Sequence, residues 1–260
     1  MTSADVRGRF LWYDLMTTDV PAAQAFYRSV AGWGVETWDA GEKPYPMWTV
    51  GERPIGGAMD LPAEAREAGA PPHWLAYVGV PDVDATTAQA AGLGATVLVA
   101  PMDIPTVGRF AVLCDPDGAV FAVFRPEGDM SGHGGAPAVG DVSWRELIAD
   151  DYAEAFAFYR ELFGWEVAED MEMGADGIYR IYGAGGPPLG GMMNKEPGMP
   201  VGAWLFYVRT DDLDAVLERV RAGGGEVLNG PMDVPGGGRI AQCRDPQGAA
   251  FALHEVGGAA

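Results

Sequence analysis

The sequence is poor in positive charge. Of its 260 residues, 17 are Lys or Arg and 37 are Asp or Glu, so the formal net charge is −20. Proteins that bind nucleic acid neutralise phosphates with clustered Lys and Arg, and binding to an anionic membrane surface needs the same cations. We therefore expect no nucleic-acid partner and no membrane partner.

Cysteine and long apolar runs are also scarce. The two cysteines, Cys114 and Cys243, lack CxxC spacing and lie in apolar segments, which argues against a disulfide framework and favours buried thiols. No apolar run approaches the roughly 18 residues of a membrane-spanning helix, and no basic segment followed by an apolar one precedes the first predicted strand. The expectation is a cytoplasmic protein. With 48% hydrophobic residues the chain can bury cores, and its length indicates about two domains.

The chain repeats itself. The segment from Leu11 to Trp33 (LWYDLMTTDVPAAQAFYRSVAGW) returns from Ser143 to Trp165 (SWRELIADDYAEAFAFYRELFGW). Later, PMDIPTVGRFAVLCDPDGAVFAV returns as PMDVPGGGRIAQCRDPQGAAFAL. A glycine-rich stretch between the two copies has the composition of a linker. We predict an N-terminal domain over residues 1–126, a linker over 127–140 and a C-terminal domain over 141–260.

Each half divides again into two similar quarters. Helices are predicted to begin after four aspartates, Asp19, Asp82, Asp151 and Asp212, because Asp is a preferred N-cap residue. Short segments rich in β-branched and aromatic residues follow, such as 96–100, 110–114 and 120–124. Each quarter therefore reads βαβββ, and the fold class is α+β with four such modules in two domains. An unrelated pair of α+β domains is the alternative.

A strand, an Asp-led helix ending in FYxxxxGW and a later DPxGxxF resemble the vicinal oxygen chelate superfamily, which includes glyoxalase I, bleomycin resistance proteins and extradiol dioxygenases. The resemblance covers essentially the whole chain and is nearest to tandem glyoxalase-like proteins of actinobacteria named as hydroxylases. It implies curved mixed sheets around clefts, with helices outside and a metal held by inward His and Glu residues. The fold itself does not specify an activity.

The family's metal-ligand positions carry no metal ligands here. The usual His positions fall on Trp12, Leu75, Trp144 and Leu205, and the usual Glu positions fall on Ala122 and Ala252. Three or four N or O donors must converge on a divalent ion, and these side chains offer none. We therefore predict no metal, no cofactor and no Lewis-acid mechanism.

Residues two apart on a strand share a face, so the residues that line each cleft can be predicted from these positions. Ligand-binding residues are predicted to be Trp12, Asp14, Tyr77, Phe124, Trp144 and Leu205. Aromatic walls suit a flat or aromatic small molecule, although the same residues could be ordinary core. Met47, Met59, Met192 and Met193 flank these clefts or fill gaps.

Glu146, Tyr207 and His254 are the predicted catalytic residues. A carboxylate beside Trp in an apolar cleft has its neutral form favoured, which suits general acid–base chemistry. In the alternative interpretation, Asp14 and Glu146 are structural and accept hydrogen bonds from Tyr, indole or backbone groups, and His254 is a half-exposed edge residue.

Two smaller patterns have mainly structural interpretations. Arg109 and Arg239 each follow an Asp in a PMDxP motif (Asp103 and Asp233), which favours an Arg–Asp pair that holds a loop over an anion contact. The pairs Gly56-Gly57 and Gly190-Gly191 favour a bulge or a close approach of strands.

Two functions follow. The first is binding of a small hydrophobic or aromatic molecule without metal. The alternative is a metal-independent enzyme of lyase, isomerase or hydroxylase type that uses Glu146. In a third interpretation one half is degenerate and supports an active C-terminal half. All four modules lie in one chain, so a monomer suffices and a homodimer stays open.

Overall fold

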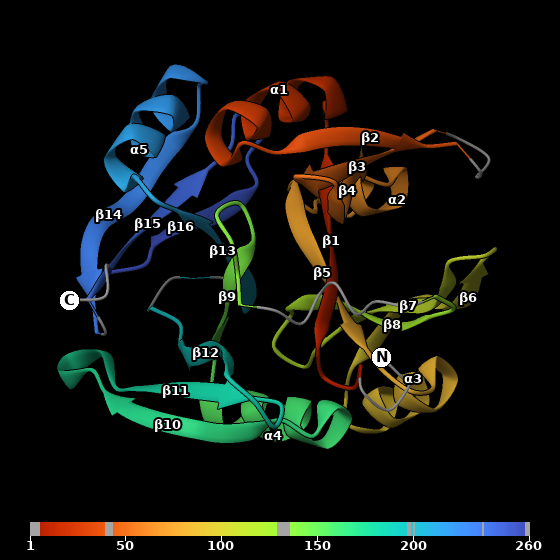
Figure 1. Cartoon of the computed structure of the whole chain (residues 1–260). Coiled ribbons are helices and arrows are strands. Elements are labelled where there is room, and N and C mark those ends of the chain that lie inside the picture. Colours follow the sequence, from red (N-terminus) through yellow and green to blue (C-terminus); the bar gives the residue numbers. More distant parts are fainter. Residues whose placement is uncertain are drawn as a thin grey trace. The chain divides into compact units, whose positions relative to one another are not determined.

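The computed structural model describes residues 6–39, 44–128, 136–196, 199, 201–235 and 237–257. Its sixteen strands form two eight-stranded mixed sheets, one from each half of the chain. Within the sequence, every quarter runs strand, helix and three strands, with one extra short helix in the first half. The predicted α+β fold with four βαβββ modules is therefore confirmed (Figure 1).

The N-terminal sheet has the strand order β2-β3-β4-β1-β5-β8-β7-β6. The strands are β1 (Phe10–Thr17), β2 (Gly34–Trp38), β3 (Tyr45–Val50), β4 (Arg53–Asp60), β5 (His73–Gly79), β6 (Thr96–Ile104), β7 (Gly108–Cys114) and β8 (Val120–Pro126). Strand β1 pairs with β4 in parallel, and β5 pairs with β8 in parallel, whereas the outer strands form antiparallel ladders.

The C-terminal sheet repeats this order as β10-β11-β12-β9-β13-β16-β15-β14. The strands are β9 (Val142–Ala149), β10 (Glu166–Glu172), β11 (Ile178–Gly183), β12 (Pro188–Asn194), β13 (Ala203–Thr210), β14 (Glu226–Val234), β15 (Gly238–Arg244) and β16 (Ala250–Glu255). A single 3-10 turn, Gly174–Asp176, lies between β10 and β11.

The four main helices begin where the aspartates predict. They are α1 (Val20–Ala31), α3 (Val83–Gly92), α4 (Tyr152–Phe163) and α5 (Leu213–Ala222), and in each the preceding Asp accepts a backbone N–H of the first turn. Helices α1 and α4 end at Gly32 and Gly164, both in the left-handed conformation that favours glycine. The short helix α2 (Ala63–Glu67) was not predicted. No helix among the described residues is long and apolar enough to span a membrane.

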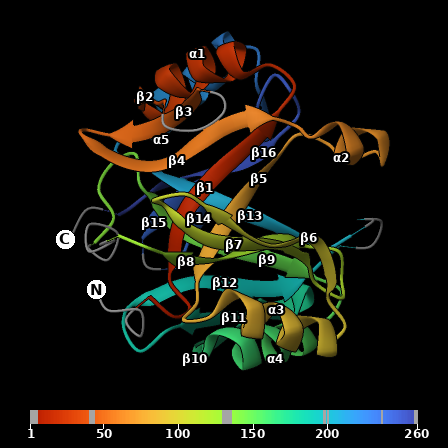
Figure 2. The same ribbon diagram turned by 90° about the vertical axis from the view of Figure 1, so that its right-hand side faces the viewer.

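The packing divides the chain differently from the sheets. One compact unit, unit 1, comprises residues 1–12, 76–134 and 145–204, and the other, unit 2, comprises 13–75, 135–144 and 205–260. Each unit therefore combines a module from each half of the chain. Helix α3 lies beside α4 in unit 1, and α1 lies beside α5 in unit 2 (Figures 1 and 2). The predicted domain limits at 126 and 141 stay a prediction, because they coincide with the sheets and not with these units.

Part of the predicted linker lies outside the described residues. Its described end is ordered within unit 2, where Gly140 donates its N–H to the carbonyl of Arg209 at 2.9 Å. The indole of Trp33 donates to the carbonyl of Gly140 at 2.7 Å.

The repeated sequence motifs meet inside each unit. In unit 2 the hydroxyl of Tyr27, from the first FYR motif, donates to Asp245 of the second DPxG motif at 3.2 Å. In unit 1 the hydroxyl of Tyr159 donates to Asp115 at 2.8 Å. Burial raises the pKa of both tyrosines well above the ordinary value, so their hydroxyls remain donors. A motif from one half of the chain thus bonds to a motif from the other half.

Indoles complete these two cores. Trp74 and Trp204 donate to the hydroxyls of Tyr27 and Tyr159, each at 3.1 Å. Trp74 and Trp204 therefore pack against helices α1 and α4. Of the two cysteines, Cys243 is buried and Cys114 is half-buried, and burial raises the pKa of both thiols, that of Cys243 to about 12. Neither thiol is poised for nucleophilic chemistry.

Candidate functional site

Four of the predicted site positions gather on one face of the C-terminal sheet within unit 2. Leu205, Tyr207 and Ala252 form a buried cluster, and Trp144 and Ile240 pack against it while remaining partly exposed. Tyr207 lies opposite Ala252 across β13 and β16, and Ala252 lies opposite Gln242 across β16 and β15. We call this set, with His254, the C-terminal face.

The orientation of this face follows from strand alternation. Phe251 of β16 packs against the rings of Phe26 and Tyr27 from α1. Ala252 and His254, being one residue and three residues further on, therefore point to the opposite side of the sheet. The helix side is filled by core, and the other side carries the candidate site.

His254 brings polar chemistry to the C-terminal face. Its Nδ1 lies 3.0 Å from the hydroxyl oxygen of Ser143, and that hydroxyl lies 3.2 Å from the carbonyl oxygen of Tyr207, to which it donates. Nearby, the amide of Gln242 donates to the Tyr207 hydroxyl at 3.4 Å. Sequence reasoning missed Ser143, Gln242 and Ile240, since only the pairing of the strands places them beside the predicted residues.

The imidazole of His254 is kept neutral by its surroundings. The ring is half-buried, and burial lowers its pKa because the charged form loses solvation. The guanidinium of Arg209, which lies across the β13–β16 ladder, lowers the pKa further. At pH 7 the ring is a neutral donor and acceptor.

The matching face of the N-terminal sheet lies in unit 1 and is apolar. Tyr77 contacts the rings of Phe110 and Phe124, with centroids 6.0 and 6.1 Å apart. Val112 and Ala122 lie opposite each other beside them. We call these five residues the N-terminal face. Phe124 occupies the position of His254, and buried Leu11 occupies that of Ser143.

The two predicted cleft carboxylates each accept a hydrogen bond from a tyrosine. In unit 1 the hydroxyl of Tyr179 donates to Glu146 at 2.9 Å, and in unit 2 the hydroxyl of Tyr45 donates to Asp14. Both carboxylates are buried, with exposed fractions of 6% and 4%. These contacts agree with the interpretation that Asp14 and Glu146 accept structural hydrogen bonds. Tyr45 and Tyr179 were missed by sequence reasoning.

The glycine pairs make these contacts possible. A Cβ atom at Gly57 would lie 2.0 Å from the Tyr45 hydroxyl, and one at Gly191 would lie 2.2 Å from the Tyr179 ring. Their partners Gly56 and Gly190 lie so close to the neighbouring strand that a Cβ would meet its backbone carbonyl at 1.9 and 1.8 Å. The predicted close approach of strands is confirmed, and the second glycine of each pair adds room for a tyrosine.

The predicted site residues are thus divided between the units. Trp144, Leu205, Tyr207 and His254 come together in unit 2, together with the separate Asp14–Tyr45 pair. Unit 1 holds Tyr77 and Phe124 in contact, the Glu146–Tyr179 pair and Trp12, which is half-buried in β1.

The residues present do not fit a divalent metal. Trp144, Leu205 and Ala252, three of the positions at which the resemblance places metal ligands, do come together, but they form an apolar cluster without a donor set. Across the residues that the structure describes, no group of three His, Cys, Asp or Glu side chains could hold an ion.

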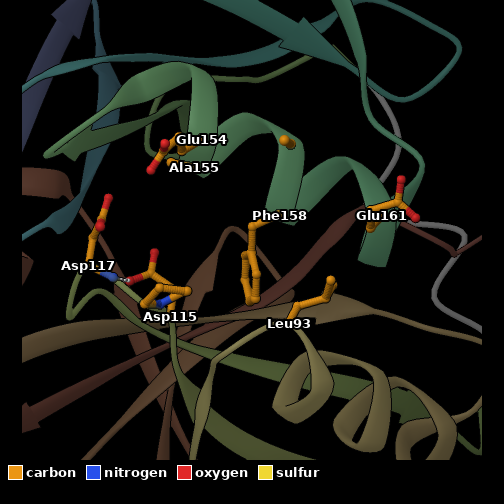
Figure 3. Close-up of a pocket in the computed structure, with 9 residues that line it drawn as sticks. Leu93, Asp115, Asp117, Glu154, Ala155, Phe158 and Glu161 are labelled. Atoms are coloured by element: carbon orange, nitrogen blue, oxygen red, sulfur yellow. Dashed lines mark hydrogen bonds between the residues drawn. The ribbon is translucent and has the colours of Figure 1, made fainter.

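A surface pocket of about 370 Å³ lies elsewhere, in unit 1 (Figure 3). Phe158 points from α4 toward Leu93 and the turn that holds Asp115. Asp115 is engaged there by the Tyr159 hydroxyl and by the N–H groups of Asp117 and Ala119. The pocket contains none of the predicted site residues.

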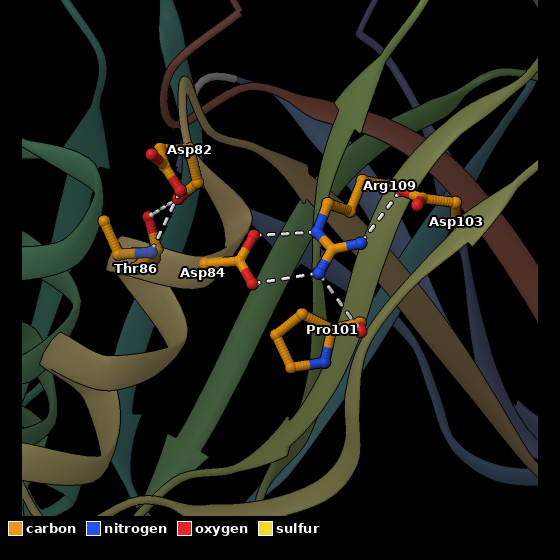
Figure 4. A network of polar contacts seen from close by, with 7 residues as sticks. Asp82, Asp84, Thr86, Pro101, Asp103 and Arg109 are labelled. Atoms are coloured by element: carbon orange, nitrogen blue, oxygen red, sulfur yellow. Dashed lines mark hydrogen bonds and ion pairs between the residues drawn. The ribbon is translucent and has the colours of Figure 1, made fainter.

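Arg109 has the structural role that its motif favours. Its guanidinium binds both carboxylate oxygens of Asp84, at 2.7 and 2.9 Å, and Asp103 at 2.9 Å (Figure 4). The hydrogen bonds from Arg109 lower the pKa of Asp84. Arg239 instead binds Asp214 at 3.0 Å and Glu255 at 2.7 Å. Both arginines therefore form ion pairs with carboxylates of this chain.

Comparison with known proteins agrees with this geometry. A model described as Glyoxalase-like domain matches residues 12–124, and one described as Glyoxalase/Bleomycin resistance protein/Dioxygenase superfamily matches residues 141–253. The chain is 36% identical over 248 residues to "Putative glyoxylase CFP32" of Mycobacterium bovis, covering 93% of this chain and 92% of the relative. It is 33% identical over 263 residues to "Anthracycline biosynthesis protein DauV" of a Streptomyces species, covering 94% and 92%.

Among solved structures, the Mn(II)-bound glyoxalase from Novosphingobium aromaticivorans superposes with a TM-score of 0.62 at 16% identity. The match covers 96% of this chain and 82% of that one, and at this identity it shows a shared fold. Taken with the repeated modules, these similarities establish that the chain belongs to the Glyoxalase/Bleomycin resistance protein/Dioxygenase superfamily.

Proposed function

We propose that the chain binds a small, mainly hydrophobic or aromatic molecule on the C-terminal face. The observation that carries the proposal is the partly exposed pair Trp144 and Ile240, which packs over the buried cluster of Leu205, Tyr207 and Ala252. Aromatic and aliphatic side chains with a few polar groups are typical of small-molecule sites. A relative named for anthracycline biosynthesis supports an aromatic ligand.

Calorimetric titration with 1-naphthol, 1-methoxynaphthalene and anthraquinone-2-sulfonate tests this proposal. We expect Trp144→Ala to weaken binding about tenfold, since a stacked aromatic contact contributes roughly 1 kcal/mol and burial of apolar area adds to it. Trp38→Ala, which removes a half-buried tryptophan of the same unit from β2, is the matched control and should bind like the wild type. Binding that is unaffected by Trp144→Ala would refute the assignment.

The same titration gives the number of sites. One molecule per chain supports a site in the C-terminal half alone, as the interpretation of a degenerate N-terminal half requires. Two equivalent sites would contradict that restriction and assign ligand binding to both faces.

A second candidate function is acid–base catalysis by Glu146 in unit 1, without Tyr207 and His254, which lie in unit 2. The nearly complete burial of the Glu146 carboxylate favours it, because buried carboxylates are suited to proton transfer near neutral pH. For any titrated compound that is converted, Glu146→Gln should lower turnover and leave the dissociation constant unchanged. The matched Asp14→Asn variant should keep its turnover. Unchanged turnover in Glu146→Gln would exclude this function.

A further inference from the structure

The contacts of Ser143 indicate where His254 carries its proton. A serine hydroxyl has one hydrogen, and a carbonyl oxygen can only accept. Because the Ser143 hydroxyl donates to the carbonyl of Tyr207 at 3.2 Å, its oxygen receives the hydrogen bond from His254 Nδ1 at 3.0 Å. This network favours the neutral tautomer with its hydrogen on Nδ1.

The other ring nitrogen, Nε2, is then an acceptor. Among the described residues it has no hydrogen-bond partner. A Cβ atom at Gly238 would lie 3.2 Å from Nε2, so the absence of a side chain there leaves space beside it. In unit 1, Gly108 lies against the Phe124 ring in the same way, which shows that the imidazole takes the place of a phenyl ring.

We propose that His254 is a hydrogen-bond acceptor that selects aromatic ligands carrying a hydroxyl group, a phenol or an enol, and that Ser143 is its positioning residue. The inference rests on the proposed binding function and names the ligand class. Three features of the face favour this class. The aromatic residues Trp144 and Tyr207 suit a ring, the Nε2 lone pair suits a donor, and the nearby Arg209 guanidinium disfavours a cationic donor such as an ammonium group.

The N-terminal face offers a natural template for the test. Phe124 shows that a phenyl ring fits the His254 position beside glycine, so His254→Phe should fold. The probes are 1-naphthol and 1-methoxynaphthalene, which share one ring system and differ in the hydroxyl hydrogen. Wild-type protein should bind 1-naphthol roughly tenfold more tightly, as one additional hydrogen bond allows. In His254→Phe the two affinities should become equal, while the affinity for 1-methoxynaphthalene stays near the wild-type value.

The role of Ser143 has a readout that does not depend on ligand. The sequence contains three histidines, and ¹⁵N NMR of labelled histidine distinguishes the two neutral tautomers. We expect His254 to carry its hydrogen on Nδ1 in the wild type and to move toward the Nε2 form in Ser143→Ala, with a reduced preference for 1-naphthol. A wild-type ring protonated on Nε2 would overturn the inference.

The outcomes separate this inference from the function on which it rests. Equal affinity of the wild type for both naphthalenes overturns hydroxyl selection and leaves aromatic binding in place. If neither compound binds while Nδ1 carries the hydrogen, the proposed binding function fails, and the ligand class fails with it.

Discussion

The two faces share one backbone plan and differ in chemistry. Tyr77 and Tyr207 lie at matching positions on β5 and β13, and an alanine lies opposite each across a parallel ladder. Around Tyr77 the neighbours are Phe110 and Phe124, whereas around Tyr207 they are polar Gln242 and Ser143. The N-terminal face therefore resembles an ordinary core, and the C-terminal face carries half-buried hydrogen-bonding groups.

By contrast, the packing motifs are the same in both units. Each contains a buried tyrosine bonded to the Asp of a DPxG turn and to an indole N–H. The two copies thus share the residues that hold each unit together. They differ on the faces of the sheets, where the C-terminal copy has polar side chains and the N-terminal copy has apolar ones. This difference directs the search for function to the C-terminal face.

The largest loss of stability is expected from replacing the aspartate of a DPxG turn. In Asp115→Ala the Tyr159 hydroxyl and two backbone N–H groups lose their acceptor in a buried place. We expect the free energy of unfolding to fall by about 3 kcal/mol, since each buried donor without a partner costs roughly 1–3 kcal/mol. Asp245→Ala should behave alike. Urea unfolding measures both, and a large loss in only one of them would show that the units are not equivalent.

The next largest change in stability is expected from exchanging the matching residues Phe124 and His254 between the two faces. Phe124→His places an imidazole where buried Leu11 offers no hydroxyl, and we expect a loss of about 2 kcal/mol for the polar group without a partner. Adding Leu11→Ser should recover part of that loss, because it supplies the missing serine. The reverse change, His254→Phe, should stay within about 1 kcal/mol of the wild type. Additive effects of the two changes in unit 1 would show no coupling between these positions.

The pH dependence of His254 sharpens the comparison further. Because its folded pKa is lowered by burial and by Arg209, the unfolded chain binds more protons between the folded pKa and about 6.5. This contribution to stability is therefore complete above about 6.5 and is lost as the pH falls through the folded pKa. NMR titration should give a pKa below 6.5, and Arg209→Met should raise it. A value above 6.5 would contradict the neutral ring.

The smallest effects are expected at the surface arginines. Arg109 and Arg239 each bind a carboxylate that is largely exposed, Asp84 at 62% and Asp214 at 68%. Solvent screens such pairs, so Arg109→Lys and Arg239→Lys should shift the unfolding midpoint slightly and by less at high salt. A salt-independent shift would indicate a role beyond ion pairing.

Local patterns predicted the modules well. Asp19, Asp82, Asp151 and Asp212 cap helices because capping depends on residues within one turn. The repeat then extended each assignment to its copy.

What escaped prediction depends on distant parts of the chain. Ser143 and His254 are 111 residues apart, and nothing near either residue indicates the other. Tyr179 reaches Glu146 only because β12 lies between their strands with Gly191 opposite Glu146. The pairing of modules from the two halves likewise involves the Tyr–Asp contacts. The sequence shows the FYR and DPxG motifs, but nothing in it indicates which tyrosine bonds to which aspartate.

The span of those contacts sets an order of events during synthesis. The bond between Tyr159 and Asp115 joins residues 44 apart, whereas that between Tyr27 and Asp245 joins residues 218 apart. Unit 1 can assemble once residue 204 has left the ribosome, while the apolar side of α1, including Phe26, waits for Phe251. Until then this side of α1 lacks its final partner, although Tyr27 of the same helix can already pack against Trp48 and Trp74, and apolar surface exposed in this way promotes aggregation of a nascent chain.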